Sequence, residues 1–176
     1  MKEIYPIVKD IYYKKGSTSF YVRKAVRAFI FKDNKLCLIH INGKDKFGLR
    51  DHYETPGGGV EDDENLELAL QREISEETGF VVKNITEIGK ISIEYNLINR
   101  IDEENFFYCE YDSEHEKALL DYEKELFKEL SWFTIDEAIY MYTHMKTINC
   151  GTMIHERDLN ALLYLINYVK PELKMN

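Results

Sequence analysis

The sequence predicts an α/β protein in which a central mixed β-sheet carries helices on both faces. Apolar, β-prone runs stand before and after one central amphipathic segment, and two further helical segments follow later in the chain. A helix between strands packs on one face of a sheet, and the later helices then have the other face to cover. One sheet between two helical layers satisfies all three observations.

The first strands are predicted as a hairpin within residues 22–41. A near-continuous apolar run from Ala25 to Phe31 forms the first strand, and Leu36 to Ile39 form the second. Asp33-Asn34 between them is a typical turn pair. Residues 48–54 predict a short third strand that leads to a glycine run.

The central helix is predicted between that glycine run and Gly79. The glycines after Pro56 indicate a tight loop, because glycine adopts backbone angles that other residues avoid. Acidic residues at 61–64 suit the N-terminal end of a helix dipole, and Gly79 suits the position just past its C-terminus. The segment between them is long enough for roughly four turns.

Three carboxylates crowd the half of this helix that is expected to be buried. At about 100° per residue, the apolar face is marked by Leu66, Ala69, Leu70 and Ile74. Glu73, Glu76 and Glu77 project into the same half, where they repel one another and need counter-charge. Arg72 supplies one positive group. A solvated, Glu-rich helix is one interpretation, and a bound Mg²⁺ or Mn²⁺ that takes carboxylate and carbonyl oxygens is the other.

Further strands are expected after the helix. Residues 80–82 begin a β region, and residues 85–97 predict one long, interrupted strand. The aromatic run at 106–111 predicts another strand, and residues 130–133 a last short one. Residues 112–128 are charge-rich and are expected to form a loop or an irregular helix.

Two helices are predicted near the end of the chain. Thr134 with Glu137 three residues later has the pattern of a capping box, so we expect a helix over 135–142. The leucine-rich segment 155–169 predicts the final helix, which ends before Pro171.

Length and composition indicate one globular domain over residues 22–176, preceded by an arm or strand at 1–21. The chain has 176 residues, of which 44% are hydrophobic and 31% charged, which suffices for a substantial core. The aromatic-rich segment 1–21 is expected to pack against the domain. Its alternative role is to close a substrate pocket or a dimer interface, so a homodimer stays open.

Charge and cysteine usage exclude several classes of partner and location. The net charge is −9, which disfavours polymeric nucleic acid, whereas a small anionic substrate stays compatible because a bound metal reverses the local field. Cys37, Cys109 and Cys150 are widely spaced and odd in number, which indicates reduced thiols and a cytoplasmic location. The five histidines form no metal-ligand spacing. Neither a signal peptide nor a membrane-spanning run is expected.

The spacing of the central segment resembles the Nudix box. Gly58 is followed after five residues by Glu64 and after seven more by the run from Arg72 to Phe80, Arg-Glu-Ile-Ser-Glu-Glu-Thr-Gly-Phe. The chain is therefore similar to the Nudix hydrolase family over the box, residues 58–80, and we extend the resemblance to about 22–168. It implies a Nudix-type α/β/α sandwich with a central mixed β-sheet.

The resemblance also implies the chemistry: hydrolysis of a nucleoside diphosphate linked to another group, with Mg²⁺ or Mn²⁺ as cofactor. Metal-assisted attack of water on phosphorus is expected. Carried over by position, the metal ligands are Gly57 (by its carbonyl), Glu73, Glu76 and Glu77. Glu73 or Glu76 instead takes the proton from water. Arg72 is expected to hold a glutamate by a charge-assisted hydrogen bond. A further acid is expected from the late charged loop, where Glu125 is chosen over Glu123 and Glu129.

The substrate contacts are the least determined part of the prediction. Arg27 and Arg50 lie on strands that can face the site, and a guanidinium suits phosphate. In the Nudix family a tyrosine shortly beyond the box accompanies dinucleoside polyphosphate substrates, and Tyr95 stands there. Thr55, where many members carry an apolar residue, makes the adjacent pocket more polar. A dinucleoside polyphosphate or a nucleoside triphosphate is expected.

Two other functions remain compatible with the box. One is a Nudix-like regulator that binds a nucleotide without turning it over, and such a protein would be expected to lose metal ligands or to carry a DNA-binding domain. The other is an enzyme that uses the same metal site on a non-nucleotide phosphate. Retention of Glu73, Glu76 and Glu77 favours the hydrolase over the regulator.

Overall fold

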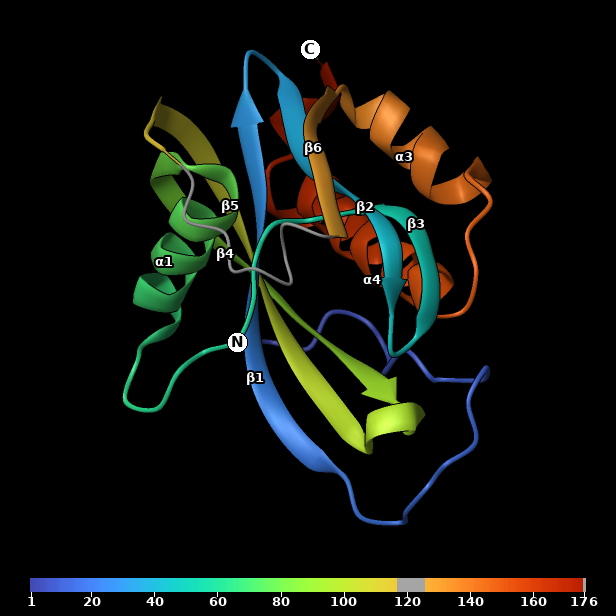
Figure 1. The fold of residues 1–176 in the computed structure, drawn as a ribbon. Coiled ribbons are helices and arrows are strands. Elements are labelled where there is room, and N and C mark those ends of the chain that lie inside the picture. The colour runs from blue at the N-terminus through green and yellow to red at the C-terminus, as the bar shows by residue number, and fades with distance from the viewer. Residues whose placement is uncertain (117–125, 176) are drawn as a thin grey trace.

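The computed structural model describes residues 1–116 and 126–175 (Figure 1). In chain order its elements are β1 (Tyr21–Lys32), β2 (Lys35–Asp45), β3 (Gly48–Glu54), α1 (Leu66–Thr78), β4 (Phe80–Tyr95), η1 (Asn96–Ile98), β5 (Arg100–Glu114), β6 (Phe127–Phe133), α3 (Ile135–His144), α4 (Cys150–Tyr164), η2 (Leu165–Val169) and η3 (Pro171–Met175). No helix in these residues is long and apolar enough to cross a membrane.

The strands of the described chain form one mixed sheet of six, as the sequence predicts. The order is β3-β2-β1-β5-β4, with β6 paired to β2. β1 and β5 run parallel from Tyr21 opposite Arg100 to Phe31 opposite Glu110, and the other strand pairs are antiparallel. A parallel pair needs a long crossover, and α1 with β4 supplies it.

β1 and β2 separate soon after their hairpin, and this separation makes room for the site. They pair only at residues 30–32 with 35–37, around a turn in which Asp33 and Asn34 have φ of 51° and 60°. Beyond that point β2 pairs with β3, while the vacated edge of β1 binds the glycine loop. Val26 N–H donates to Gly58 O at 2.9 Å, and Val60 N–H donates to Lys24 O at 3.0 Å.

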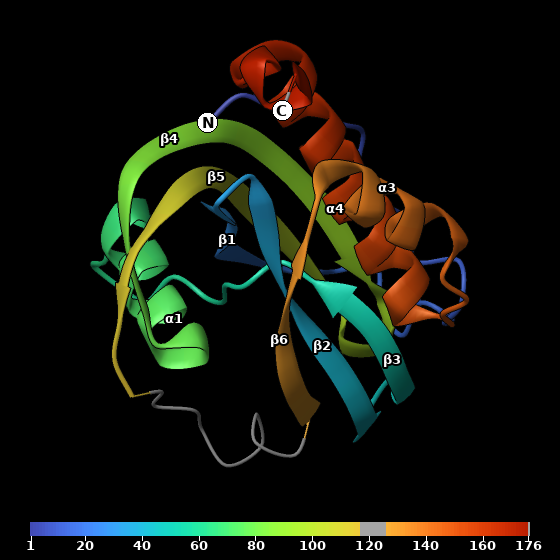
Figure 2. The ribbon, with the colours of Figure 1, turned by 90° about the horizontal axis from the view of Figure 1, so that it is seen from above.

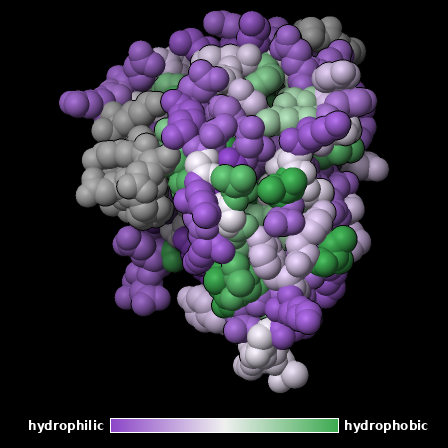
Figure 3. All heavy atoms as spheres, turned by 45° about the vertical axis from the view of Figure 1, so that its right-hand side comes forward, coloured by the Kyte–Doolittle hydropathy of each residue, from purple (hydrophilic) through white to green (hydrophobic). Residues whose placement is uncertain are grey.

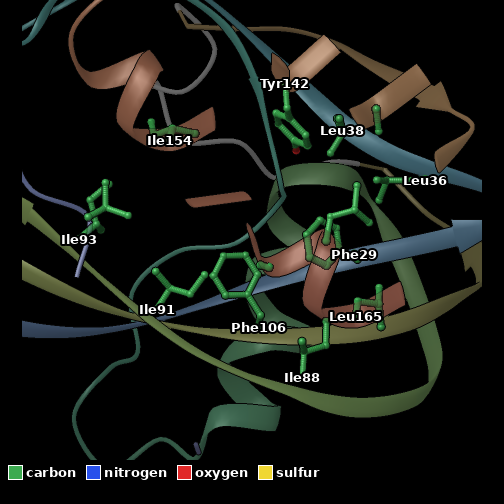
Figure 4. Packing of buried hydrophobic residues seen from close by; sticks show 14 of the residues in the cluster. Phe29, Leu36, Leu38, Ile88, Ile91, Ile93, Phe106, Tyr142, Ile154 and Leu165 are labelled. Atoms are coloured by element: carbon green, nitrogen blue, oxygen red, sulfur yellow. The ribbon is translucent and has the colours of Figure 1, made fainter. Parts of the chain in front are cut away.

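The helices form two layers on opposite faces of the sheet (Figures 1 and 2). On β1, Val26, Ala28 and Ile30 belong to the cluster with Leu70 and Ile74 of α1. The alternate residues Phe29 and Phe31 belong to the larger cluster that α3 and α4 cover. This two-residue alternation is what a sheet buried on both faces requires. Figure 4 shows the larger cluster, in which Phe29, Phe106 and Leu165 pack together.

The N-terminal arm lies along the outer edge of β4. Val8 N–H donates to Ser92 O, and Glu94 N–H donates to Val8 O, both at 2.9 Å. Further along, Asp10 Oδ2 accepts from Asn96 N at 2.8 Å. The Tyr13 hydroxyl then reaches the carbonyl of Phe47 in the β2–β3 turn. The domain boundary at residue 21 stays a prediction.

Most predicted elements are present, with shifted ends. α1 is capped by the Asn65 side chain, which accepts from Leu68 N, and it ends at Gly79 with φ of 73°. The capping box of Thr134 and Glu137 is formed. β5 begins at Arg100 rather than at 106, because its polar first residues pair with β1 and β4.

Two expectations need correction. The final helix begins at Cys150, not at 155, because buried Cys150, Met153 and Ile154 extend the apolar face beyond the leucine-rich part. The segment 112–128 is not uniformly irregular, since β5 continues to Glu114 and β6 begins at Phe127. Residues 117–125 between them lie outside the described chain.

Candidate active site

The glycine loop is held between β1 and α1 too tightly for side chains. Gly57 has φ of 140°, and a Cβ there would lie 2.0 Å from the Val26 carbonyl oxygen. A Cβ on Gly58 would lie 2.4 Å from Glu73 Oε2. The glycines therefore let the loop backbone approach both the strand and the carboxylate helix.

Glu77 is the most deeply buried of the three glutamates on α1. Its residue is 6% exposed, and its Oε2 accepts from the Gly57 N–H at 2.7 Å. Burial raises the pKa of Glu77 well above its ordinary value, against the lowering effect of Arg27. Burial also raises the pKa of half-buried Glu73, although Arg72 opposes it. Burial therefore disfavours the charged form of both carboxylates in spite of the arginines beside them.

Arg72 joins the carboxylates to the loop. Its Nε and Nη2 donate to the two oxygens of Glu64 at 3.0 and 2.9 Å, and Nη2 also donates to Gly59 O at 2.9 Å. Its Nη1 donates to Glu73 at 2.8 Å and to Glu76 at 3.3 Å. One guanidinium thus orients three carboxylates, including Glu64, which the box spacing suggests as a structural member.

Arg27 supports the loop from the opposite face. Its Nη1 donates to the carbonyls of Gly57 at 3.0 Å and Thr55 at 3.2 Å. Its Nε donates to Glu104 at 2.9 Å, and Glu54 lies at 3.7 Å. Arg27 is therefore bonded to the carbonyl that the sequence nominated as a metal ligand.

Helix α4 clamps the start of the loop. Asp158 Oδ2 accepts from Thr55 N at 2.9 Å and from Thr55 Oγ1 at 3.2 Å. Arg157 donates from Nε to Asp158 Oδ1 at 2.7 Å and from Nη1 to Glu104 at 3.1 Å. Arg157, Asp158 and Glu104 are all fully buried, so this network is stable only while every charge stays paired.

Glu54 is a further acid beside the loop. Burial alone would raise its pKa, but the hydrogen bond from His52 and the charge of Arg27 hold the pKa of Glu54 well below its usual range. His52 Nε2 lies 3.0 Å from Glu54 Oε2. Glu54 is thus a fixed anion that positions Arg27.

Two predicted site residues of the described chain do not contact the glycine loop. Arg50 donates to Asp45 at 2.8 Å, lies 3.2 Å from His52 and reaches the group only through a long ion pair with Glu54 at 3.9 Å. Tyr95 is 5% exposed, and its ring packs 5.5 Å from that of Phe47. Glu125 lies outside the described residues.

Glu54, Glu104, Arg157 and Asp158 were not nominated by the sequence. For Asp158 there is a retrospective signal, because it stands in phase with buried Ala161, Leu162 and Leu165 on α4. A charged residue in an apolar stripe needs a buried partner. Nothing in the sequence pattern identifies Thr55 as that partner.

The residues at the loop fit a hard divalent cation. They offer carboxylate oxygens and a backbone carbonyl, which Mg²⁺ and Mn²⁺ prefer, and a cation there would favour the charged form of Glu77, whose pKa burial raises. Among residues 1–116 and 126–175, no three His, Cys, Asp or Glu side chains are grouped closely enough to hold an ion as they stand. Arg72 holds Glu73 and Glu76, so binding would require a carboxylate to exchange partners.

A carboxylate-bearing helix behind a glycine loop, in an α/β/α sandwich, defines the class of the Nudix hydrolases. Residues 22–149 match the family model described as NUDIX domain. The chain belongs to the Nudix family.

Solved structures have the same fold. A NUDIX hydrolase from Nitrosomonas europaea has a TM-score of 0.58 and 22% identity, over 78% of this chain and 88% of that one. A MutT NUDIX hydrolase from Burkholderia pseudomallei has a TM-score of 0.59 and 20% identity, over 79% of this chain and 98% of that one. A protein described as an ADP compounds hydrolase has a TM-score of 0.63 and 17% identity, over 85% of this chain and 74% of that one. Comparison with curated proteins gave no match.

Proposed function

We propose that this protein hydrolyses a nucleoside diphosphate linked to another group, with Mg²⁺ or Mn²⁺ as cofactor. The observation that carries the proposal is the pairing of buried Glu77 with the glycine loop inside a complete Nudix box. Glu77 accepts from the Gly57 N–H at 2.7 Å, and Glu73 lies against Gly58. A buried carboxylate of raised pKa beside a half-buried one is costly unless a cation or substrate uses it.

The proposed roles follow from the contacts of each residue. Glu73, Glu76, Glu77 and the Gly57 carbonyl would hold the cation, which supplies charge neutralisation of the diphosphate and acidification of water. Arg72 orients Glu73 and Glu76. Either of these two accepts the proton of the attacking water. Glu125 is proposed as a further acid on the basis of sequence alone.

The substrate is proposed as a small nucleotide, not a nucleic-acid polymer, and the location as cytoplasmic. The likeness in fold to a protein described as an ADP compounds hydrolase supports testing nucleoside diphosphate derivatives. Burial of Tyr95 removes the specific support for dinucleoside polyphosphates, so nucleoside triphosphates are tested beside them. Three buried cysteine thiols are compatible with a reducing compartment.

A substrate panel tests the proposal. Nucleoside triphosphates, dinucleoside polyphosphates and ADP- and UDP-linked compounds are incubated with Mg²⁺ or Mn²⁺, and the products are separated by chromatography. Turnover of at least one compound is expected, with loss of activity in excess EDTA. In ¹⁸O-water the label should enter a phosphate-bearing product, since attack is at phosphorus. Undiminished turnover in EDTA, or label in the other group, contradicts the proposal.

A further inference from the structure

The arginines that the sequence nominated for phosphate contact are already bonded. Arg27 donates to Glu104, Gly57 and Thr55. Arg50 donates to Asp45 at 2.8 Å. A guanidinium whose donors are held by carboxylates and carbonyls must break those bonds to bind phosphate.

Arg23, four residues before Arg27 on β1, differs from both. Its side chain makes no hydrogen bond to any described residue, and its ion pair with Asp102 is long, at 3.7 Å. Asp102 is held more closely by Arg100, at 2.6 Å from Nε and 2.8 Å from Nη2. The side chain of Arg23 is 33% exposed. Its donors are therefore accessible and weakly used.

The guanidinium of Arg23 lies directly against the glycine loop. A Cβ on Gly59 would be 2.2 Å from Arg23 Nη2 and 2.8 Å from its Cζ. The fixed glycine of the box spacing is Gly58, so the box does not by itself explain Gly59. A side chain at 59 would push the guanidinium aside, so Gly59 leaves Arg23 room to lie against the loop.

Two consecutive glycines of the loop thus lie next to side chains of opposite charge. Gly58 faces the carboxylate of Glu73, and Gly59 faces the guanidinium of Arg23. Under the proposed function, a diphosphate derivative held at the carboxylates would follow a path past Gly59 toward Arg23. A planar guanidinium next to that path can bind two oxygens of one phosphate.

We propose that Arg23 is a phosphate-binding residue that contacts a non-bridging oxygen of the substrate's diphosphate. This inference rests on the proposed function and assigns the phosphate contact to Arg23 instead of Arg27 or Arg50. Because the contact is with an oxygen that is anionic before and during reaction, it stabilises ground state and transition state alike. Its loss therefore raises KM more than it lowers kcat.

The test compares Arg23→Gln, Arg23→Lys and the control Lys24→Gln. Lys24 is the next residue on β1, is exposed, and contacts the loop through its backbone carbonyl. Arg23→Gln should raise KM about tenfold or more with kcat within about threefold, Arg23→Lys should recover part of the loss, and Lys24→Gln should resemble wild type. Urea midpoints should change little, because Asp102 keeps its closer contacts with Arg100, and Glu104 keeps its bonds to Arg27 and Arg157.

Calorimetric binding of α,β-methylene-ADP in Mg²⁺ provides a readout that needs no turnover. Binding should weaken about tenfold in Arg23→Gln and stay unchanged in Lys24→Gln. Turnover by wild type with equal KM and equal binding in Arg23→Gln overturns the assignment and leaves the proposed function standing. If Arg23→Gln binds α,β-methylene-ADP more weakly but the wild type turns over no compound, the proposed hydrolysis is overturned and the phosphate contact of Arg23 stands. Neither turnover nor binding by wild type overturns both.

Discussion

At the scale of a single residue, Glu77 is an acidic side chain in a buried position, and burial opposes its charge. It lies on the buried face of α1, 6% exposed, and it accepts one hydrogen bond from Gly57 N. Burial disfavours its charged form and raises its pKa. A neutral side chain would occupy this place without that cost, and the proposed function assigns the carboxylate a cation to bind.

Replacing Glu77 by Gln separates the functional from the structural role. Glu77→Gln should lower activity in Mg²⁺ by roughly two orders of magnitude, because a ligand that stabilises the transition state is lost. In EDTA at pH 7 its stability should equal wild type or exceed it by up to about 1 kcal/mol, because repulsion with Glu73 is relieved. The raised pKa fixes the sign with pH: the gain grows as pH rises above the ordinary carboxyl pKa and is absent below it.

Urea unfolding in EDTA at pH 7 and at pH 4, beside a turnover assay, measures both effects. An ordinary ion-paired glutamate would behave in the opposite way, with activity intact and stability slightly reduced. That outcome would mean that Glu77 has a structural role and does not bind a metal.

At the scale of elements, the site depends on how three elements meet at the glycine loop. β1 binds the loop backbone along the edge that β2 leaves. α1 brings Glu77 to Gly57 N, and α4 brings Asp158 to Thr55. Each contact includes a backbone group of the loop, so the loop conformation largely decides the geometry.

Two glycines with φ in the left-handed range test this dependence. Gly57→Ala should cost about 3 kcal/mol or more and abolish activity, because its Cβ would meet the Val26 carbonyl at 2.0 Å. Gly48→Ala has φ of 96° but no atom within 4 Å of the added Cβ, so it should cost about 1 kcal/mol of backbone strain and leave activity unchanged. Equal effects in urea unfolding and turnover would mean that backbone strain alone, not loop packing, is responsible.

At the scale of the whole molecule, the arm completes the edge of the sheet. Residues 2–8 pair with β4, and Tyr13 contacts the β2–β3 turn. An exposed strand edge is a hazard for aggregation, and the arm covers this one. On the face shown in Figure 3 the apolar side chains form small, separate patches among hydrophilic ones. A homodimer therefore stays a prediction without a chosen surface.

Substitution of Val8 should detach the arm. Val8 is 1% exposed, whereas Ile11 is 79% exposed, so Val8→Asp should cost about 2 kcal/mol and Ile11→Asp close to nothing. Glu94 N donates to Val8 O, and Lys90 N donates to Lys2 O. Hydrogen exchange at these two amides should accelerate in Val8→Asp. Unchanged protection there would show that the arm does not depend on this anchor.

The sequence by itself determined the layers and the helix of the Nudix box. The near-continuous apolar run from Ala25 to Phe31 and the capping residues Thr134 and Gly79 act within a few neighbours, so local pattern predicts them. The Nudix box likewise determined the family, because its spacing is confined to one loop and one helix.

Only the tertiary structure decided what surrounds that helix. Glu104 and Asp158 are far in sequence from Arg27 and Thr55, yet they hold them at hydrogen-bonding distance. Arg23, Arg27 and Arg50 look equivalent as charged residues on strands, and they differ only in which carboxylates or carbonyls lie beside them. A side chain's available donors depend on partners that the fold brings from distant elements, and no local periodicity encodes that distance.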